Sequence, residues 1–206
     1  MKTLREVVGG RRERRPRPLA VGRCLALALL LFGAGCARTP AARYYVLDAP
    51  NGTVVAGERT GPLLGLGPIT LPGYLDRPQI VTRSSDSQLQ LLGQARWAEP
   101  FAESFERLLR ARVAAALPNA RVIGMPWKAS SAPEKRVTVQ VERCDRGADG
   151  NLVLVARWTV TVGEQAGGSQ HVSNVAVPAS ADTSALVAAH AEAIARLAAE
   201  IAGALR

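Results

Sequence analysis

The feature that most constrains the fold of this chain is a pair of strand-like segments joined by an Asp-Gly turn. In "RVTVQVERC" (136–144) valines alternate with polar residues, and "NLVLVARWTVTV" (151–162) continues this alternation. A period of two is typical of a strand that buries one face. The Asp-Gly pair at 149–150 supplies residue types that tolerate positive φ in tight turns. The sequence therefore predicts an antiparallel β-hairpin with one buried face.

Further strands are predicted before and after this hairpin. The stretch 61–83 is extended, because its four prolines exclude a helix. Prolines also remove ladder donors, so this stretch is expected to form an edge strand or a strand interrupted by a bulge. The other predicted strands begin at "RYYVLDAP" (43–50) and cover 88–99, 120–124 and 172–177.

Two amphipathic helices complete the predicted fold. "PFAESFERLLRARVAAALP" (100–118) has an apolar stripe at helical spacing, with Pro100 suited to the first helical position. The second helix occupies the C-terminal segment and is capped by Asp182 or Thr183. Strands occur in groups separated by single helices, which predicts an α+β fold: a largely antiparallel sheet with two amphipathic helices packed on one face.

The basic charge of the chain is concentrated at its N-terminus. Residues 1–35 carry a net charge of +6 out of +9, and the apolar run "CLALALLLF" (24–32) follows the arginines. Nine apolar residues are too few to span a bilayer as a helix, which needs about 20. This arrangement is typical of an export signal, so residues 1–35 are predicted to be a lipoprotein signal peptide. Because the remaining charge is modest, no nucleic-acid partner is expected.

Cys36 directly follows small residues, which resembles a bacterial lipobox with Cys36 as the acylated mature N-terminus. Gly33 stands where the usual pattern has Leu, which leaves open ordinary cleavage near residues 37–42 and release of a soluble periplasmic protein. Ala37, rather than Asp, follows the cysteine and favours the outer membrane. We therefore predict a lipidated tether at 36–43 and an α+β domain at 44–206. Localisation is expected at the periplasmic face of the outer membrane, through the lipid anchor.

The mature chain offers little catalytic chemistry. Its only histidines are His171 and His190, and Cys144 is its only cysteine besides Cys36. An enzyme needs a nucleophile, an acid/base pair or a metal set at usable spacing, and none is recognisable here. His190 lies on an apolar helix face, and Cys144 is expected to be structural. We predict no enzymatic activity, no cofactor and no metal site.

The chain contains, in this order, "YYVL", "ITLPGYLDRPQIVTRSSDSQLQLLGQARWAEP", "FAESFERLLRARVAAALP", the hairpin and the final helix, which cover about residues 44–203. Together these stretches resemble the PqiC-like family of ABC-type transport auxiliary lipoproteins. The resemblance implies a non-catalytic, outer-membrane-anchored subunit of an MCE-linked lipid transport system. It also implies an MCE-domain protein as partner and a role in envelope integrity. MCE proteins form rings, so a homo-oligomer is compatible with the resemblance.

The best candidate for partner contact is "LPGYLDRPQIV" (71–81), where prolines hold a preformed loop. Its candidate residues are Leu71, Tyr74, Leu75, Arg77 and Ile80. The competing interpretation is that these residues enter the core at the edge of the sheet. In that case, the segment 163–171, expected to be an exposed loop, is the next candidate. The two tryptophans of the strand-like segments, Trp97 and Trp158, are expected to anchor the core.

Two other functions remain open from the sequence. A free-standing envelope scaffold lipoprotein would require a recognisable set of glycan-binding residues. A periplasmic lipid-binding carrier would require a deep apolar pocket that shields one lipid.

Overall fold

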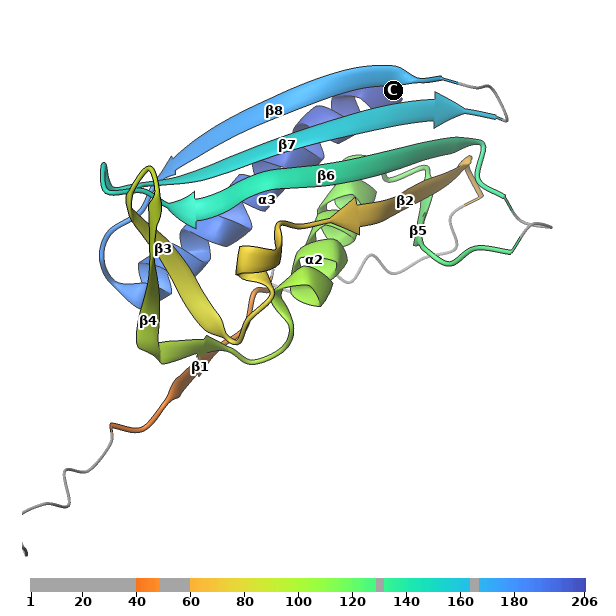
Figure 1. The fold of residues 1–206 in the computed structure, drawn as a ribbon. Coiled ribbons are helices and arrows are strands. Elements are labelled where there is room, and N and C mark those ends of the chain that lie inside the picture. Colours follow the sequence, from red (N-terminus) through yellow and green to blue (C-terminus); the bar gives the residue numbers. More distant parts are fainter. Residues whose placement is uncertain (1–39, 49–59, 129–131, 164–166) are drawn as a thin grey trace, which may run out of the picture. The chain divides into compact units, whose positions relative to one another are not determined.

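The computed structural model describes residues 40–48, 60–128, 132–163 and 167–206, and Ala41–Arg206 form one compact unit (Figure 1). The predicted signal peptide and Cys36 lie outside the described residues. The described chain contains an eight-stranded sheet, a 3₁₀ turn η1 and two helices. The strands are β1 (Arg43–Tyr45), β2 (Leu63–Thr70), β3 (Gln79–Ser85), β4 (Gln88–Trp97), β5 (Arg121–Gly124), β6 (Lys135–Arg146), β7 (Asn151–Val162) and β8 (Ser169–Pro178).

The predicted hairpin is confirmed and forms the longest pairing of the sheet. β6 and β7 pair antiparallel, and β8 continues the antiparallel meander beyond β7. The connecting turn comprises residues 147–150 and contains the Asp-Gly pair, and β6 extends two residues beyond its predicted end, to Arg146. Gly150 supplies the positive φ, at 85°, whereas Asp149 accepts a bond from the Asn151 amide at 3.2 Å through its carboxylate. The meander therefore gives the sheet its antiparallel character.

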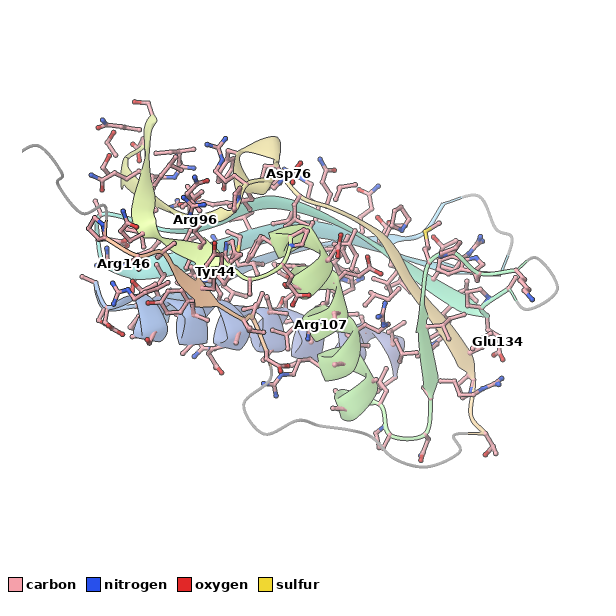
Figure 2. The ribbon with its side chains drawn as sticks, turned by 90° about the horizontal axis from the view of Figure 1, so that it is seen from below. Tyr44, Asp76, Arg96, Arg107, Glu134 and Arg146 are labelled. Atoms are coloured by element: carbon pink, nitrogen blue, oxygen red, sulfur yellow. The ribbon has the colours of Figure 1, made fainter. Side chains whose placement is uncertain are left out.

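The remaining strands extend the sheet from β6. The order is β1-β4-β3-β6-β2-β5, with β3 and β4 antiparallel and β2 parallel to both β5 and β6. The prediction of an edge strand for the proline-rich stretch is wrong for β2, which lies between β5 and β6. Its alternative, a bulge, is confirmed by a register shift between Leu66 and Ile69, around Pro68. At the other end, Tyr44 of β1 pairs with Arg96 of β4 (Figure 2).

Both helices lie on the same face of the β6–β7–β8 meander (Figure 1). They are α2 (Phe101–Ala116) and α3 (Thr183–Leu205). Pro100 is the N-cap of α2 rather than its first helical residue. Asp182 caps α3, because its carboxylate accepts a 2.9 Å bond from the Ala185 amide. The predicted α+β fold, with a largely antiparallel sheet and two helices on one face, is confirmed.

The core lies between the helices and the sheet. Phe105, Leu108 and Leu109 of α2 are buried and belong to the same apolar cluster as the inward residues of β6 and β7. Trp97 and Trp158 are buried, as predicted. Each fully buried side chain of this size contributes about 1.5–3 kcal/mol relative to exposure. This apolar layer joins the two helices to the sheet.

Candidate partner-binding surface

The predicted contact segment 71–80 joins β2 to β3 and contains η1 (Gly73–Leu75). Only Arg77 among the five candidates is exposed. Leu75 and Ile80 are 6% and 0% exposed, and the expectation that their apolar side chains lie at the surface is wrong. The reason is local geometry: the 3₁₀ turn points Leu75 inward, and Ile80 begins the buried part of β3. Leu71 and Tyr74 are half-buried and pack against the core.

A buried carboxylate holds this segment in place. The Tyr74 hydroxyl donates a 2.8 Å hydrogen bond to Oδ2 of Asp145, whose side chain is completely buried. Arg83 binds the same carboxylate with both ends of its guanidinium, Nε to Oδ1 at 3.0 Å and Nη2 to Oδ2 at 3.1 Å. Arg143 adds a contact from Nε to Oδ1 at 3.1 Å. We call Tyr74, Arg83, Arg143 and Asp145 the Asp145 cluster; it joins η1, β3 and β6.

The protonation states of the Asp145 cluster agree with its hydrogen bonds. Burial opposes ionisation of Asp145, but the hydrogen bonds from Arg83 and Tyr74 and the nearby charge of Arg143 hold its pKa below the usual range. Burial, together with the bond to Asp145, raises the pKa of Tyr74 to about 12. The bond to Asp145 raises the pKa of Arg83. The Tyr74 phenol therefore stays protonated and donates, and the Asp145 carboxylate stays ionised and accepts. The cluster thus holds the β2–β3 connection against β6.

Asp145, Arg83 and Arg143 were not predicted as site residues from the sequence. The signal was a break in the alternation of "RVTVQVERCDR", where the strand register shifts between Val141 and Arg143. This shift places Asp145 in register with Val153, on the face of the sheet opposite the inward-facing Leu152 and Leu154. A buried acid at that position needs cationic partners, because an unpaired buried charge is costly.

A surface recess of about 340 Å³ lies beside the segment 71–80. Its apolar lining comes from Pro78, Trp97, Ala98 and Pro100, and its charged lining from Asp76, Arg77 and Glu99. Asp76 lies at the tip of this loop (Figure 2). The Trp97 amide donates to the Pro78 carbonyl at 2.7 Å, which fixes the two sides of the recess against each other. We call this feature the Arg77 recess; it combines an apolar lining with charges of both signs.

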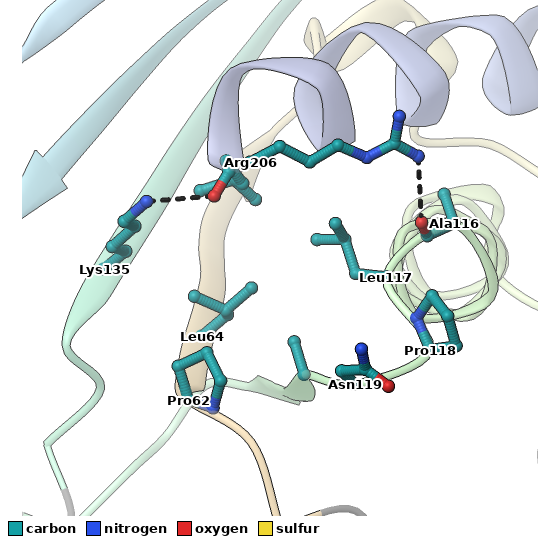
Figure 3. A pocket seen from close by; sticks show the side chains of 10 residues that line it. Pro62, Leu64, Ala116, Leu117, Pro118, Asn119, Lys135 and Arg206 are labelled. Atoms are coloured by element: carbon teal, nitrogen blue, oxygen red, sulfur yellow. Dashed lines mark hydrogen bonds between the residues drawn. The ribbon is translucent and has the colours of Figure 1, made fainter.

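A second recess of about 440 Å³ lies where the C-terminal ends of α2 and α3 approach β2 and β6 (Figure 3). Lys135 donates to the Leu205 carbonyl at 2.9 Å, and Arg206 donates to the Ala116 carbonyl at 3.2 Å. Both cations thus cap helix C-termini, where the helix dipole favours positive charge. Leu64 and Leu117 supply apolar lining.

The histidines and the buried cysteine have structural surroundings. His190 contacts the rings of Trp97 and Phe101, each in an edge-to-face arrangement, and its Nδ1 is 2.8 Å from the Leu186 carbonyl. Burial lowers the pKa of His190 to about 4. His171 stacks on Trp158 at 4.1 Å. Cys144 is a buried free thiol, and burial raises its pKa, so it lacks the thiolate character that a nucleophile needs.

Within the described ranges, no three His, Cys, Asp or Glu side chains gather closely enough to hold a metal ion. None of the helices in these ranges has the length and apolar character needed to cross a membrane.

Comparison with known proteins agrees with this architecture. A solved structure of an uncharacterized protein is 21% identical, with a TM-score of 0.68 over 81% of this chain and 100% of that one. Protein XCC0632 from Xanthomonas campestris is 20% identical, with a TM-score of 0.59 over 80% of this chain and 92% of that one. These two likenesses establish a shared fold. No curated protein matches the chain.

The family comparison identifies the chain. The model of the ABC-type transport auxiliary lipoprotein component matches residues 45–202, which is most of the sequence. The match confirms the resemblance to the PqiC-like family inferred from the sequence. The chain therefore belongs to the family of ABC-type transport auxiliary lipoprotein components.

Proposed function

We propose that this protein is a non-catalytic lipoprotein subunit of an MCE-linked, ABC-type intermembrane lipid transport system. Cys36 anchors it to the periplasmic face of the outer membrane, and the folded domain docks the MCE-domain protein. The proposal is supported by the family match and by the order of signal peptide, Cys36 and folded domain along the sequence. Loss of the subunit then weakens the envelope, because the transport path between the membranes is incomplete.

The docking role is supported by one loop that combines a fixed residue with exposed charged residues. Tyr74 is fixed by the Asp145 cluster, while Asp76 and Arg77 remain exposed beside the Arg77 recess. A segment already fixed in the free protein loses little conformational entropy when a partner binds. A recess with an apolar lining and a few charged groups fits an apolar anchor of the partner, oriented by ion pairs at its border.

Affinity purification from solubilised envelopes tests the docking role. We expect the tagged protein to retain the MCE-domain subunit, and cells lacking the gene to become sensitive to detergents. Purification without any MCE-domain protein, combined with an intact envelope in the deletion strain, would contradict the proposal.

The anchor has its own test. Mass spectrometry of the mature N-terminus is expected to find a lipid-modified Cys36, and Cys36→Ala is expected to release the protein from sedimented membranes. The matched control Cys144→Ala removes the buried thiol and should leave the protein in the membrane fraction. An unmodified N-terminus after Ala37 would instead identify a soluble periplasmic protein.

A further inference from the structure

β8 (Ser169–Pro178) is an open edge of the sheet. Among the described residues it pairs only with β7, and in Figure 1 it is the outermost strand of the meander. Its sequence, "SQHVSNVAVP", contains no charged residue and no proline before the last position, and its register with β7 is continuous. Natural proteins usually protect a long edge strand with lysines, prolines or bulges, because its free backbone groups can pair with another chain. Apart from Pro178 at its C-terminal end, β8 uses none of these.

The hydrogen-bond pattern identifies the backbone groups that face outward. The Ala179 amide donates to the Gly150 carbonyl at 2.8 Å, so Asn151 and Pro178 form a non-hydrogen-bonded pair. Alternation along the strand then directs the amide and carbonyl groups of Gln170, Val172, Asn174 and Ala176 away from β7. The Ala176 carbonyl accepts a 3.3 Å bond from Arg196 of α3, as expected for an outward group.

β8 is also held in place by contacts on its helix-facing side. The Trp158 indole donates to the Ser173 hydroxyl at 2.9 Å, and that hydroxyl in turn donates to Glu200 of α3. Val175 and Val177 are buried on the same side, against the helix layer. The edge is therefore ordered before any partner arrives, and pairing with it costs little further ordering. The segment 169–171, expected to be a loop, belongs to this strand.

The side chains beside the edge define what an added strand would meet. On the face away from the helices, Val172 is 63% exposed and Asn174 and Ala176 are exposed too. On the helix side, Arg196 and Glu200 flank the edge with opposite charges. An uncharged segment fits these surroundings, with β-branched or small residues on the outer face and polar residues facing α3.

We propose that the β8 edge binds an extended, uncharged segment of the partner subunit as a ninth strand of the sheet. Main-chain hydrogen bonds to Gln170, Val172 and Asn174 supply the affinity, as in other cases of strand addition. The inference rests on the proposed function, since it takes the MCE-domain protein as the source of that segment. It assigns a second contact, separate from the Arg77 recess.

Hydrogen exchange with the purified full-length mature protein and the MCE-domain protein of the same organism tests this directly. Outward amides at 170, 172 and 174 should exchange fast in the free protein and slowly in the complex. Inward amides at 171, 173 and 175 already bond to β7 and should change little. Side-chain docking without strand addition would not produce this alternation.

A matched pair of variants supplies the second readout. Asn174→Pro removes one outward donor while leaving the bonds to β7 intact, a substitution that edge strands tolerate. Asn174→Thr keeps the donor. We expect Asn174→Pro to weaken binding roughly tenfold or more, and Asn174→Thr to stay within about threefold. If Asn174→Pro lowers the melting temperature substantially, the exchange pattern of the unmodified protein decides.

The possible outcomes separate the two proposals. Binding of the MCE-domain protein with no slowed amides in β8, and equal affinity for both variants, overturns the strand addition but leaves the proposed function intact. A complete lack of binding overturns both. Outward amides that become protected when the protein alone is concentrated would show that a second copy occupies the edge, which overturns the assignment to the partner.

Discussion

The Tyr74 hydroxyl donates a 2.8 Å hydrogen bond to Oδ2 of Asp145, although the two residues are 71 positions apart in the sequence. This contact attaches the β2–β3 connection to the end of β6, and the Cys144 amide contacts the same hydroxyl at 3.4 Å. Tyr74 is therefore part of the folded framework rather than a freely exposed anchor. Its removal should affect stability first and partner binding through it.

Tyr74→Phe is expected to lower the free energy of unfolding by about 1–3 kcal/mol, because the buried carboxylate loses one donor. The phenyl ring, which stacks near Arg83 at 5.9 Å, is retained in this variant. Urea unfolding monitored by circular dichroism gives the measurement. Tyr44→Phe is the matched control: Tyr44 is 65% exposed, and its substitution should change stability by less than about 0.5 kcal/mol. Equal stabilities of the two variants would contradict a stabilising role for the Asp145 cluster.

The burial of His190 predicts that the stability of the protein depends on pH. Its pKa falls from 6.5 in the unfolded chain to about 4 in the buried site, so the unfolded state binds a proton at higher pH than the folded state. The contribution is fully present above pH 6.5 and is lost progressively as the pH falls towards 4, by an amount of about 3 kcal/mol. Asp145, whose pKa is lowered, loses its contribution only at more acidic pH.

His190→Leu isolates this effect, because it keeps an apolar side chain in the site and removes the titration. Unfolding free energies measured between pH 7 and 4 should fall less steeply in the variant than in the unmodified protein. Parallel curves over that window would show that His190 does not titrate as its burial predicts.

Local patterns made the hairpin and the helices predictable, since each depends on residues close together in the sequence. The β6–β7 alternation and the Asp182 cap needed no long-range information. The Asp145 cluster was not predictable, because it depends on a register shift in β6 that brings Asp145 to Tyr74 and Arg83. The burial of Leu75 and Ile80 was not predicted either, because the residue pattern does not reveal the 3₁₀ turn and the start of β3 that direct these side chains inward.

The positive φ of Gly150 predicts that any side chain at this position of the hairpin turn lowers the stability of the protein. A side chain at φ +85° is strained, although a Cβ there would meet only Arg146, at 3.7 Å. Gly150→Ala should therefore destabilise the protein by about 1 kcal/mol, and Gly150→Val by more. Gly203→Ala is the matched change in α3, where nothing lies within 4 Å of the added Cβ, and it should be neutral or stabilising. Similar melting temperatures for the two alanine variants would argue against a backbone origin.

The Arg77 recess gives the sharpest test of the docking site, because one of its lining residues can be enlarged without touching the core. Ala98 is exposed, and only its backbone is engaged, through a 2.8 Å bond from its amide to the Tyr45 carbonyl. Ala98→Trp should fill the recess and weaken binding of the MCE-domain protein about tenfold or more, with the melting temperature unchanged. Ala188→Trp, at an exposed position of α3 outside the recess, controls for the added aromatic surface. Affinities measured by calorimetry that fall equally in both variants, or in neither, would place the docking surface away from Arg77.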